Sequence, residues 1–162
     1  MKAYLDIETS FWGEITIIGV YRADHQFIQL VGEEVTKSNL MKILEGVETL
    51  YTYNGSRFDL PVIERELRVD LTRHLHSHDL MYDCWRQNLF GGLKRVEEQL
   101  GIPRLSKGID GLEAMYLWDR YKRWQDEEAL KTLLLYNKED VLNLPILERR
   151  LFILSAIRLT AA

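Results

Sequence analysis

The chain opens with alternating apolar and polar positions, a pattern that predicts a β-strand over Lys2–Ile7. Successive side chains of a strand point to opposite faces, so Leu5 and Ile7 share one face. Asp6 and Glu8 share the other face. Two carboxylates that point the same way repel each other, which is costly near a core unless a cation offsets the charge. The pattern indicates either an exposed strand face or a site for a hard metal ion such as Mg²⁺ or Mn²⁺.

Apolar residues at three- and four-residue spacings predict a long helix near the C-terminal end of the sequence. Asp140 falls inside this apolar stripe, where a solvated charge is not expected. Tyr136 lies one turn before it, so its hydroxyl projects toward the same place. The pair indicates either a tyrosine–aspartate hydrogen bond within a core or two groups that bind something there.

The remaining pattern predicts one domain, residues 1–162, with an α/β fold and a single sheet. Strands are expected at Lys2–Ile7, Ile15–Tyr21, Phe27–Val31, Thr49–Tyr53 and His76–Met81. Helices are expected at Ser38–Glu45, Pro61–Val69, Met81–Leu89, Leu93–Leu100, Leu112–Tyr121 and Glu127–Ser155. A break in the last helix is expected near Pro145, because proline lacks the backbone donor that a helix interior uses.

A further acidic residue, Asp59, follows the strand predicted at Thr49–Tyr53. It stands just after a glycine turn and just before Pro61, which marks the first turn of a helix. A carboxylate in this place either caps the helix and complements its dipole or adds a ligand to the acidic residues described above. Asn54, at the end of the strand, is positioned to hold the loop through its side-chain amide.

Composition adds limits to this picture. Hydrophobic residues make up 46% of the chain and charged residues 28%, which is typical of a globular protein and not of a disordered one. No apolar run reaches the length of a membrane span, so we expect no membrane association. The single cysteine, Cys84, favours a reducing compartment and predicts a cytoplasmic location. The sequence leaves the oligomeric state open.

Three segments, in this order, resemble the three sequence motifs of the DEDD 3′–5′ exonucleases: Asp6-Ile7-Glu8-Thr9, Asn54 to Asp59, and Tyr136-Asn137-Lys138-Glu139-Asp140. The tyrosine four residues before the last aspartate resembles the tyrosine subclass, DEDDy. The wording around Asp59 and the stretch from Gly92 to Ile102 resemble the ribonuclease H-like domain of YprB type, from Lys2 to about Leu151. This resemblance implies a five-stranded mixed sheet of order 3-2-1-4-5, with strand 2 antiparallel, flanked by helices.

The same resemblance implies a metal-dependent exonuclease that removes 5′-mononucleotides from the 3′ end of single-stranded RNA or DNA. Four convergent carboxylates, from Asp6, Glu8, Asp59 and Asp140, can hold two divalent cations (Mg²⁺ or Mn²⁺) about 3.5–4 Å apart. Tyr136 would orient the attacking water or, with its pKa lowered by the cations, help remove a proton. A non-catalytic nucleic-acid-binding module and an endonuclease on the same fold remain alternatives.

The net charge of −4 is unusual for a protein that binds nucleic acid. Four of the acidic residues are the candidate ligands, however, and two divalent cations would cancel their charge. The net charge therefore predicts short-range binding of a nucleic-acid strand end and no extended basic surface for the phosphate backbone.

Several neighbouring residues are candidates for substrate binding. Phe11 and Trp12 follow the first motif on a predicted loop, where they either stack on the terminal base or pack against the protein. Phe58 either wedges against a base or packs the helix. Asn54 and Arg57 are further candidate contacts, the latter with phosphate.

Overall fold

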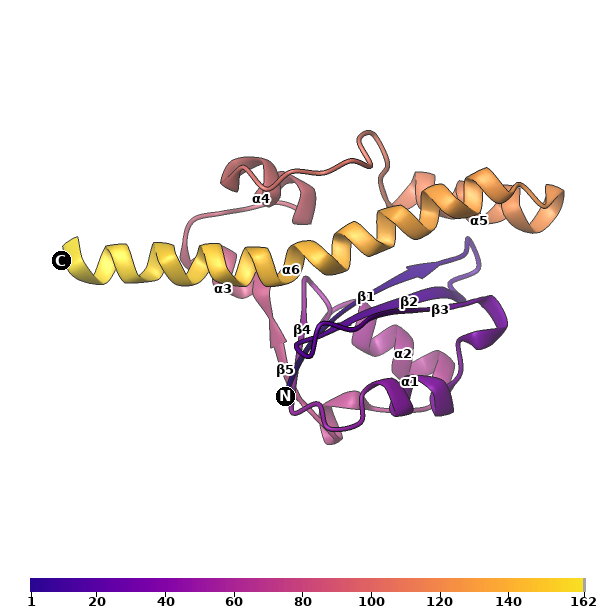
Figure 1. Ribbon diagram of the computed structural model, residues 1–162, viewed down its shortest axis with the longest axis horizontal. Helices are drawn as coiled ribbons and strands as arrows, with labels where there is room; N and C mark the ends of the chain where they lie inside the picture. The colour runs from indigo at the N-terminus through magenta and orange to yellow at the C-terminus, as the bar shows by residue number, and fades with distance from the viewer. Residues whose placement is uncertain (162) are drawn as a thin grey trace.

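A five-stranded mixed sheet forms the centre of the protein (Figure 1). The computed structural model describes residues 1–161. The strands are β1 (Lys2–Thr9), β2 (Ile15–Arg22), β3 (Phe27–Val31), β4 (Thr49–Thr52) and β5 (His76–Asp79). Their order is β3-β2-β1-β4-β5; β2 pairs antiparallel with β1 and β3, and β4 pairs parallel with β1 and β5. The predicted strand order and directions are confirmed.

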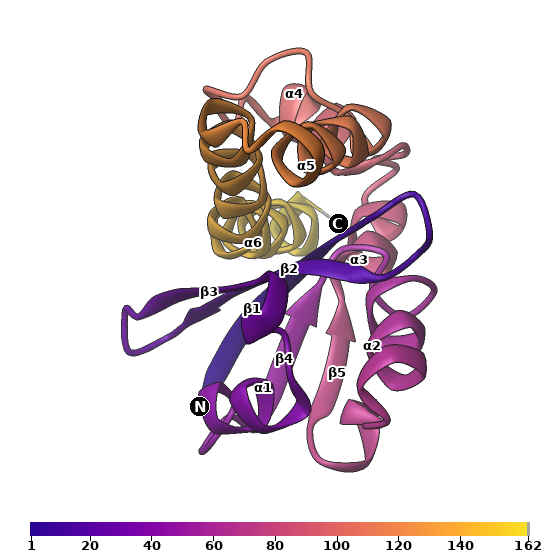
Figure 2. The ribbon, with the colours of Figure 1, turned by 90° about the vertical axis from the view of Figure 1, so that its right-hand side faces the viewer.

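Helices cover both faces of this sheet (Figure 2). The helices are α1 (Lys37–Ile43), α2 (Asp59–Leu67), α3 (Leu80–Arg86), α4 (Leu93–Leu100), α5 (Gly111–Trp124) and α6 (Glu127–Ala161), with 3₁₀ turns at Gly32–Glu34 and Leu71–Arg73. The first two helices lie on one face, whereas α6 crosses the other face with α4 and α5 beyond it (Figures 1 and 2). None of the helices within residues 1–161 combines the length and apolar composition needed to cross a bilayer.

The alternation of β1 divides the core between these two faces. Leu5 and Ile7 are buried in the apolar cluster that includes residues of α1 and α2. Tyr4, on the other face, is buried with Leu144 and Leu147 of α6. Asp6 and Glu8 share this second face because they continue the same alternation. The sheet therefore presents its two strand carboxylates toward the longest helix.

The long helix is continuous, so the predicted break near Pro145 is wrong. Helix α6 runs through Pro145 without interruption (Figure 1). Proline removes one hydrogen bond of the helix, but Leu144 and Leu147 on either side are fully buried. Packing on both sides of the missing bond compensates for it. Asp140 and Glu148 consequently belong to one rigid element.

Other boundaries shift because short polar side chains cap the helices. Strand β5 ends at Asp79, two residues before the predicted end, since the Asp79 carboxylate accepts a hydrogen bond from the Met81 amide (3.1 Å) and begins α3. Helix α1 begins one residue early because the Thr36 hydroxyl accepts from the Asn39 amide (3.2 Å).

Candidate functional site

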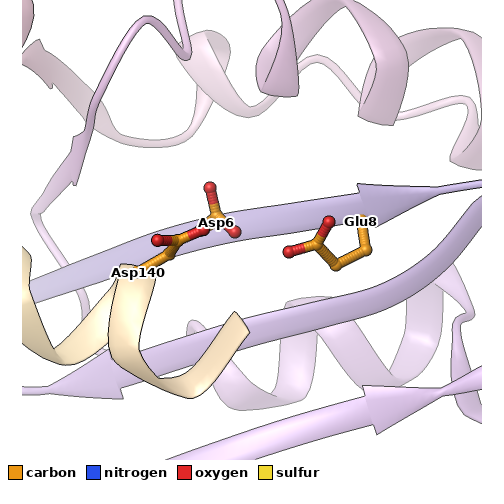
Figure 3. Close-up of side chains that lie close together, drawn as sticks. All are labelled: Asp6, Glu8 and Asp140. Carbon is orange, nitrogen blue, oxygen red and sulfur yellow. The ribbon is translucent and has the colours of Figure 1, made fainter. Parts of the chain in front are cut away.

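Three carboxylates converge where β1 passes under α6. Asp6 and Glu8 come from the strand and Asp140 from the helix, and all three point into the space between the two elements (Figure 3). One oxygen of each carboxylate lies within 4.8 Å of the corresponding oxygens of the other two. The strand alternation and the helical spacing seen in the sequence therefore bring these residues together.

Close contact between α6 and the sheet fixes this geometry. Gly19 of β2 pairs with Asp6 of β1, and a Cβ at Gly19 would lie 2.3 Å from Oδ1 of Asn137. The missing side chain lets Asn137 approach the sheet, where its Nδ2 donates to Oδ2 of Asp6 (3.0 Å). Asn137 thus ties the helix to the first carboxylate.

Asp59 reaches the same site from the other side of the sheet. It is the first residue of α2 and is buried, and its Oδ1 accepts a hydrogen bond from the Ile7 amide (3.1 Å). The residue at the N-cap position is Phe58, which makes no capping bond. The Asp59 carboxylate joins α2 to β1, but it is not among the three carboxylates whose oxygens lie within 4.8 Å of one another.

A cavity of about 200 Å³ is lined by all four acidic residues, Asp6, Glu8, Asp59 and Asp140. Tyr136 of α6, Asn54 and Phe58 also line it. The remaining lining residues are Ile7, Thr9, Tyr53, Gly111 and Met115. The structure thus gathers residues from four segments that are far apart in the sequence around one small space.

Burial and mutual repulsion make these acids hard to ionise together. Burial, followed by the charges of the neighbouring carboxylates, raises the pKa of Asp6 and of Glu8 well above the usual range. Burial raises the pKa of Asp59 to about 7. It raises that of Asp140 to about 6, although the Arg104 guanidinium opposes the shift.

This arrangement fits a divalent cation. Oε1 of Glu8 is buried and has no hydrogen-bond partner within the described chain. Oxygen-only ligands with excess negative charge are what Mg²⁺ and Mn²⁺ prefer, and a bound ion would relieve both the repulsion and the unpaired oxygen. Asp6, Glu8 and Asp140 are therefore placed to hold such an ion.

Tyr136 lines the cavity as a neutral hydroxyl. Burial raises its pKa far above the ordinary value, and the charges of Asp140 and Glu8 add to the shift. Nζ of Lys94 donates a hydrogen bond to the Tyr136 hydroxyl (3.0 Å). A protonated tyrosine suits the orientation of a water molecule better than proton removal.

The predicted substrate contacts divide into two groups. Asn54 and Phe58 line the cavity, but it is the backbone amide of Asn54, not its side chain, that holds the loop by donating to Oδ1 of Asp79 (2.8 Å). Arg57 lies outside the cavity lining, with its guanidinium over the rings of Tyr82 (5.9 Å) and Trp85 (5.4 Å). Arg57 therefore packs on α3.

Phe11 and Trp12 lie in the turn between β1 and β2, and the structure separates their roles. The Phe11 ring meets the edge of Tyr116 on α5, with centroids 4.9 Å apart. Trp12 is 87% exposed. Phe11 thus packs against the protein in part, whereas Trp12 is largely exposed to solvent beside the first motif.

Three charged residues at the site escaped the reasoning from sequence. Lys94 and Glu97 lie on α4, and Arg104 follows in the loop before α5. Arg104 forms ion pairs with both Glu97 and Asp140. A signal was available for two of them, because Lys94 and Glu97 match the stretch from Gly92 to Ile102 that resembles the YprB-type domain, but it did not identify a partner.

The sheet order and the acidic site together define a ribonuclease H-like domain. A sequence profile of the RNase H superfamily matches residues 3–152, and the chain belongs to this superfamily. Among solved structures, the chain is similar to the family B DNA polymerase from the hyperthermophilic archaeon Pyrobaculum calidifontis, with a TM-score of 0.68 and 18% identity. The similarity covers 98% of this chain and 24% of the polymerase chain. The comparison with curated proteins gave no significant match.

Membership of this superfamily supports a nuclease function and implies a nucleic-acid substrate. Nucleases with this fold generally use divalent metal ions, and the cluster of Asp6, Glu8 and Asp140 provides suitable ligands. The resemblance to the polymerase structure, at its low identity, concerns the fold.

Proposed function

We propose that the protein is a metal-dependent 3′–5′ exonuclease of the DEDDy type, acting on single-stranded nucleic acid. The observation that carries this proposal is the convergence of Asp6, Glu8 and Asp140 beside Tyr136 in one cavity. Asp59 lines the same cavity as a fourth carboxylate. The resemblance of the motif sequences to those of the YprB-type domain supports the tyrosine subclass.

In this mechanism the chain supplies ligands, orientation and a base-binding surface. Asp6, Glu8, Asp59 and Asp140 would hold two divalent cations, Mg²⁺ or Mn²⁺, which supply positive charge to the scissile phosphate and lower the pKa of the attacking water. The Tyr136 hydroxyl would hold that water in line with phosphorus. Water oxygen forms a bond to phosphorus while the bond to the 3′ oxygen of the preceding nucleotide breaks, which releases a 5′-mononucleotide.

Aromatic side chains would hold the last base during this step. Phe58 lines the cavity and Trp12 is exposed on the adjoining turn. Base–aromatic stacking contributes about 1–3 kcal/mol per base and tolerates any sequence. A stacked terminal base would place its own phosphate over the carboxylates, so digestion would begin at the chain end.

The decisive test is digestion of single-stranded RNA and DNA labelled at the 5′ end, with Mg²⁺ or Mn²⁺ and with EDTA. We expect a ladder of products that shorten by one nucleotide, only with metal. Discrete internal cuts would instead indicate an endonuclease, and binding without cleavage would indicate a non-catalytic module.

Blocked ends test the polarity separately. A 3′-phosphate adds bulk and charge where the terminal hydroxyl should lie, so it should stop digestion, whereas a 5′-phosphate should not. An enzyme that is stopped by the 5′ block and not by the 3′ block has the opposite polarity to the one proposed.

A further inference from the structure

A buried charged triad lies directly behind the candidate metal ligands, and two of its three members lie outside the three motifs. The Arg104 guanidinium contacts Oε2 of Glu97 at 2.7 Å and Oε1 at 3.0 Å, and it also donates to Oδ1 of Asp140. Side-chain exposure is 9% for Arg104, 1% for Glu97 and 9% for Asp140. The triad connects α4, the loop after it and α6.

Stability does not account for this triad. Taking charges out of water costs free energy that their attraction often fails to repay, and apolar replacements for a buried triad are often equally stable or more stable. Nε of Arg104 is also buried without an acceptor in the described chain, which adds a further cost. An arrangement that is this expensive in free energy is expected to serve the site beside it.

The triad has the geometry of a clamp on one carboxylate. A guanidinium is a rigid, planar fork, so its contacts with Glu97 fix the direction in which it meets Asp140. Glu97 is itself held, because Nδ2 of Asn143 on α6 donates to its Oε1 (3.0 Å). Arg104 engages Oδ1 of Asp140, and no protein group in the described chain donates to Oδ2. One oxygen is thereby held while the other remains free to ligate.

A second set of contacts pins the loop that carries Arg104. The Glu139 carboxylate, next to Asp140 on α6, accepts hydrogen bonds from the backbone amides of Leu105 (2.6 Å) and Ser106 (2.8 Å). The hydroxyl of Ser106 also donates to Glu139. Two successive acidic residues of the helix therefore bind the same loop, so Arg104 cannot move independently of Asp140.

We propose that Arg104, held by Glu97, is a positioning residue that fixes the Asp140 carboxylate for metal binding. This inference rests on the proposed function, since it assigns Asp140 to a metal ion. Outer groups that orient a metal ligand typically change metal affinity or activity by about 10–100-fold when they are removed. The loop from Arg104 to Ser106 thus belongs to the metal site although it contributes no ligand.

The test uses a double variant, Glu97→Gln with Arg104→Gln, which removes both charges of the Arg104–Glu97 pair and leaves Asp140 without its guanidinium partner. Its melting temperature without metal should fall, because a buried carboxylate has lost its ion pair, so each protein is compared by the shift that added metal produces. The Mg²⁺ or Mn²⁺ concentration that gives half of the maximal thermal stabilisation should rise about 10–100-fold. In cleavage assays, kcat at fixed metal should fall while KM for the oligonucleotide stays unchanged.

Two further variants separate charge from geometry. Arg104→Lys keeps the charge but loses the fork, so it should recover only part of the metal affinity. The control, Lys2→Gln with Glu148→Gln, removes an ion pair that also involves α6 but lies outside the cavity, and it should leave the metal response unchanged. If the lysine variant fails to fold, the double variant still decides the question.

The outcomes distinguish this inference from the proposed function. Metal stabilisation that is the same in the double variant and the wild type overturns the positioning role, even if the wild type is an exonuclease. Metal stabilisation that weakens in the double variant, in a protein that cleaves nothing, supports the positioning role and overturns the proposed function. A wild type whose melting temperature does not respond to either metal overturns both.

Discussion

Strand β1 and helix α6 meet through polar side chains at two places, and the two places are built in opposite ways. At one end, Lys2 and Tyr4 of the strand meet Glu148 of the helix, with Nζ and the hydroxyl each 2.5 Å from a carboxylate oxygen. At the other end, Asp6 and Glu8 of the same strand face meet Asp140. The first contact pairs opposite charges, and the second gathers like charges.

The carboxyl groups respond accordingly. Burial alone would raise the pKa of Glu148, but hydrogen bonds from Lys2 and Tyr4 hold it below its usual value. Burial and repulsion leave the pKa of Asp6 well above its usual value. The same strand and helix therefore accommodate a compensated acid without difficulty. The excess negative charge of Asp6, Glu8 and Asp140, called the uncompensated group, is a property of these residues and not of the fold. We therefore assign this group to cation binding.

The largest expected effect comes from removing one acid of the uncompensated group. Asp6→Asn should lower cleavage by about 10³-fold or more, because a catalytic metal ion supplies several kcal/mol of transition-state stabilisation and each 1.4 kcal/mol is a factor of ten. It should also abolish the rise in melting temperature with Mg²⁺ or Mn²⁺. Single-turnover cleavage and thermal melts measure the two effects.

The matched control is Glu148→Gln at the compensated end. It should lower stability by about 1–3 kcal/mol, since it weakens charged hydrogen bonds from Lys2 and Tyr4, while metal-dependent cleavage persists. Equal losses of cleavage in the two variants would mean that the two contacts do not differ in function.

The second effect in size concerns the two tyrosines of this interface. Tyr136→Phe keeps the ring and deletes the hydroxyl, so cleavage should fall by about 10²-fold, the usual cost of losing the orientation of a reacting group. Metal stabilisation should persist. Tyr4→Phe deletes the hydroxyl that binds Glu148 and should leave turnover intact. Near-normal turnover by Tyr136→Phe would make its hydroxyl structural.

A smaller effect is expected from the exposed turn beside the acids. Trp12→Ala should weaken binding of a short single strand by about 5- to 150-fold, which corresponds to about 1–3 kcal/mol of stacking, and should leave metal affinity unchanged. Phe11→Ala is the matched comparison, because Phe11 already packs against Tyr116. Fluorescence anisotropy measures both. A larger loss of binding for Phe11→Ala than for Trp12→Ala would show that Phe11, and not Trp12, stacks on the base.

The sequence predicted those parts of the site that local periodicity controls. Alternation placed Asp6 and Glu8 on one face of β1, and the four-residue spacing placed Tyr136 one turn before Asp140. The sheet order came from the resemblance to a known family, because periodicity does not specify which strands pair. Pro145 misled the prediction because packing of its neighbours outweighs the lost hydrogen bond.

The residues that only the structure revealed depend on long-range contact. Arg104 lies in an irregular loop, and its partners come from α4 and α6, so no local pattern announces the pairing. Arg57 shows a second contact that the sequence did not indicate. Its place beside the second motif predicts a phosphate contact, which stays a prediction, whereas its stacking on Tyr82 and Trp85 follows only from where α3 lies.

The last effect concerns stability and not cleavage: it is the pH dependence of stability without metal. The folded-state pKa values of Asp59 (about 7) and Asp140 (about 6) lie above the ordinary value of 3.8. The folded state therefore binds more protons than the unfolded state between about pH 4 and pH 7, so stability falls as pH rises through this interval. Glu148, with its lowered pKa, contributes stability that is lost only as pH falls below about 4.5. A decline between pH 5 and pH 7.5 is thus expected from Asp59 and Asp140 and not from Glu148.

Thermal melts in EDTA between pH 5 and pH 7.5 measure this decline, and each kcal/mol should lower the melting temperature by about 2–4 °C in a domain of this size. Asp6→Asn should flatten the curve and raise its value at pH 7.5, because one repelling charge is gone. Stabilisation by Mg²⁺ should grow with pH, since metal binding displaces protons from the same oxygens. A melting temperature that rises steadily to pH 7.5 in EDTA would contradict the repulsion on which the metal site is argued.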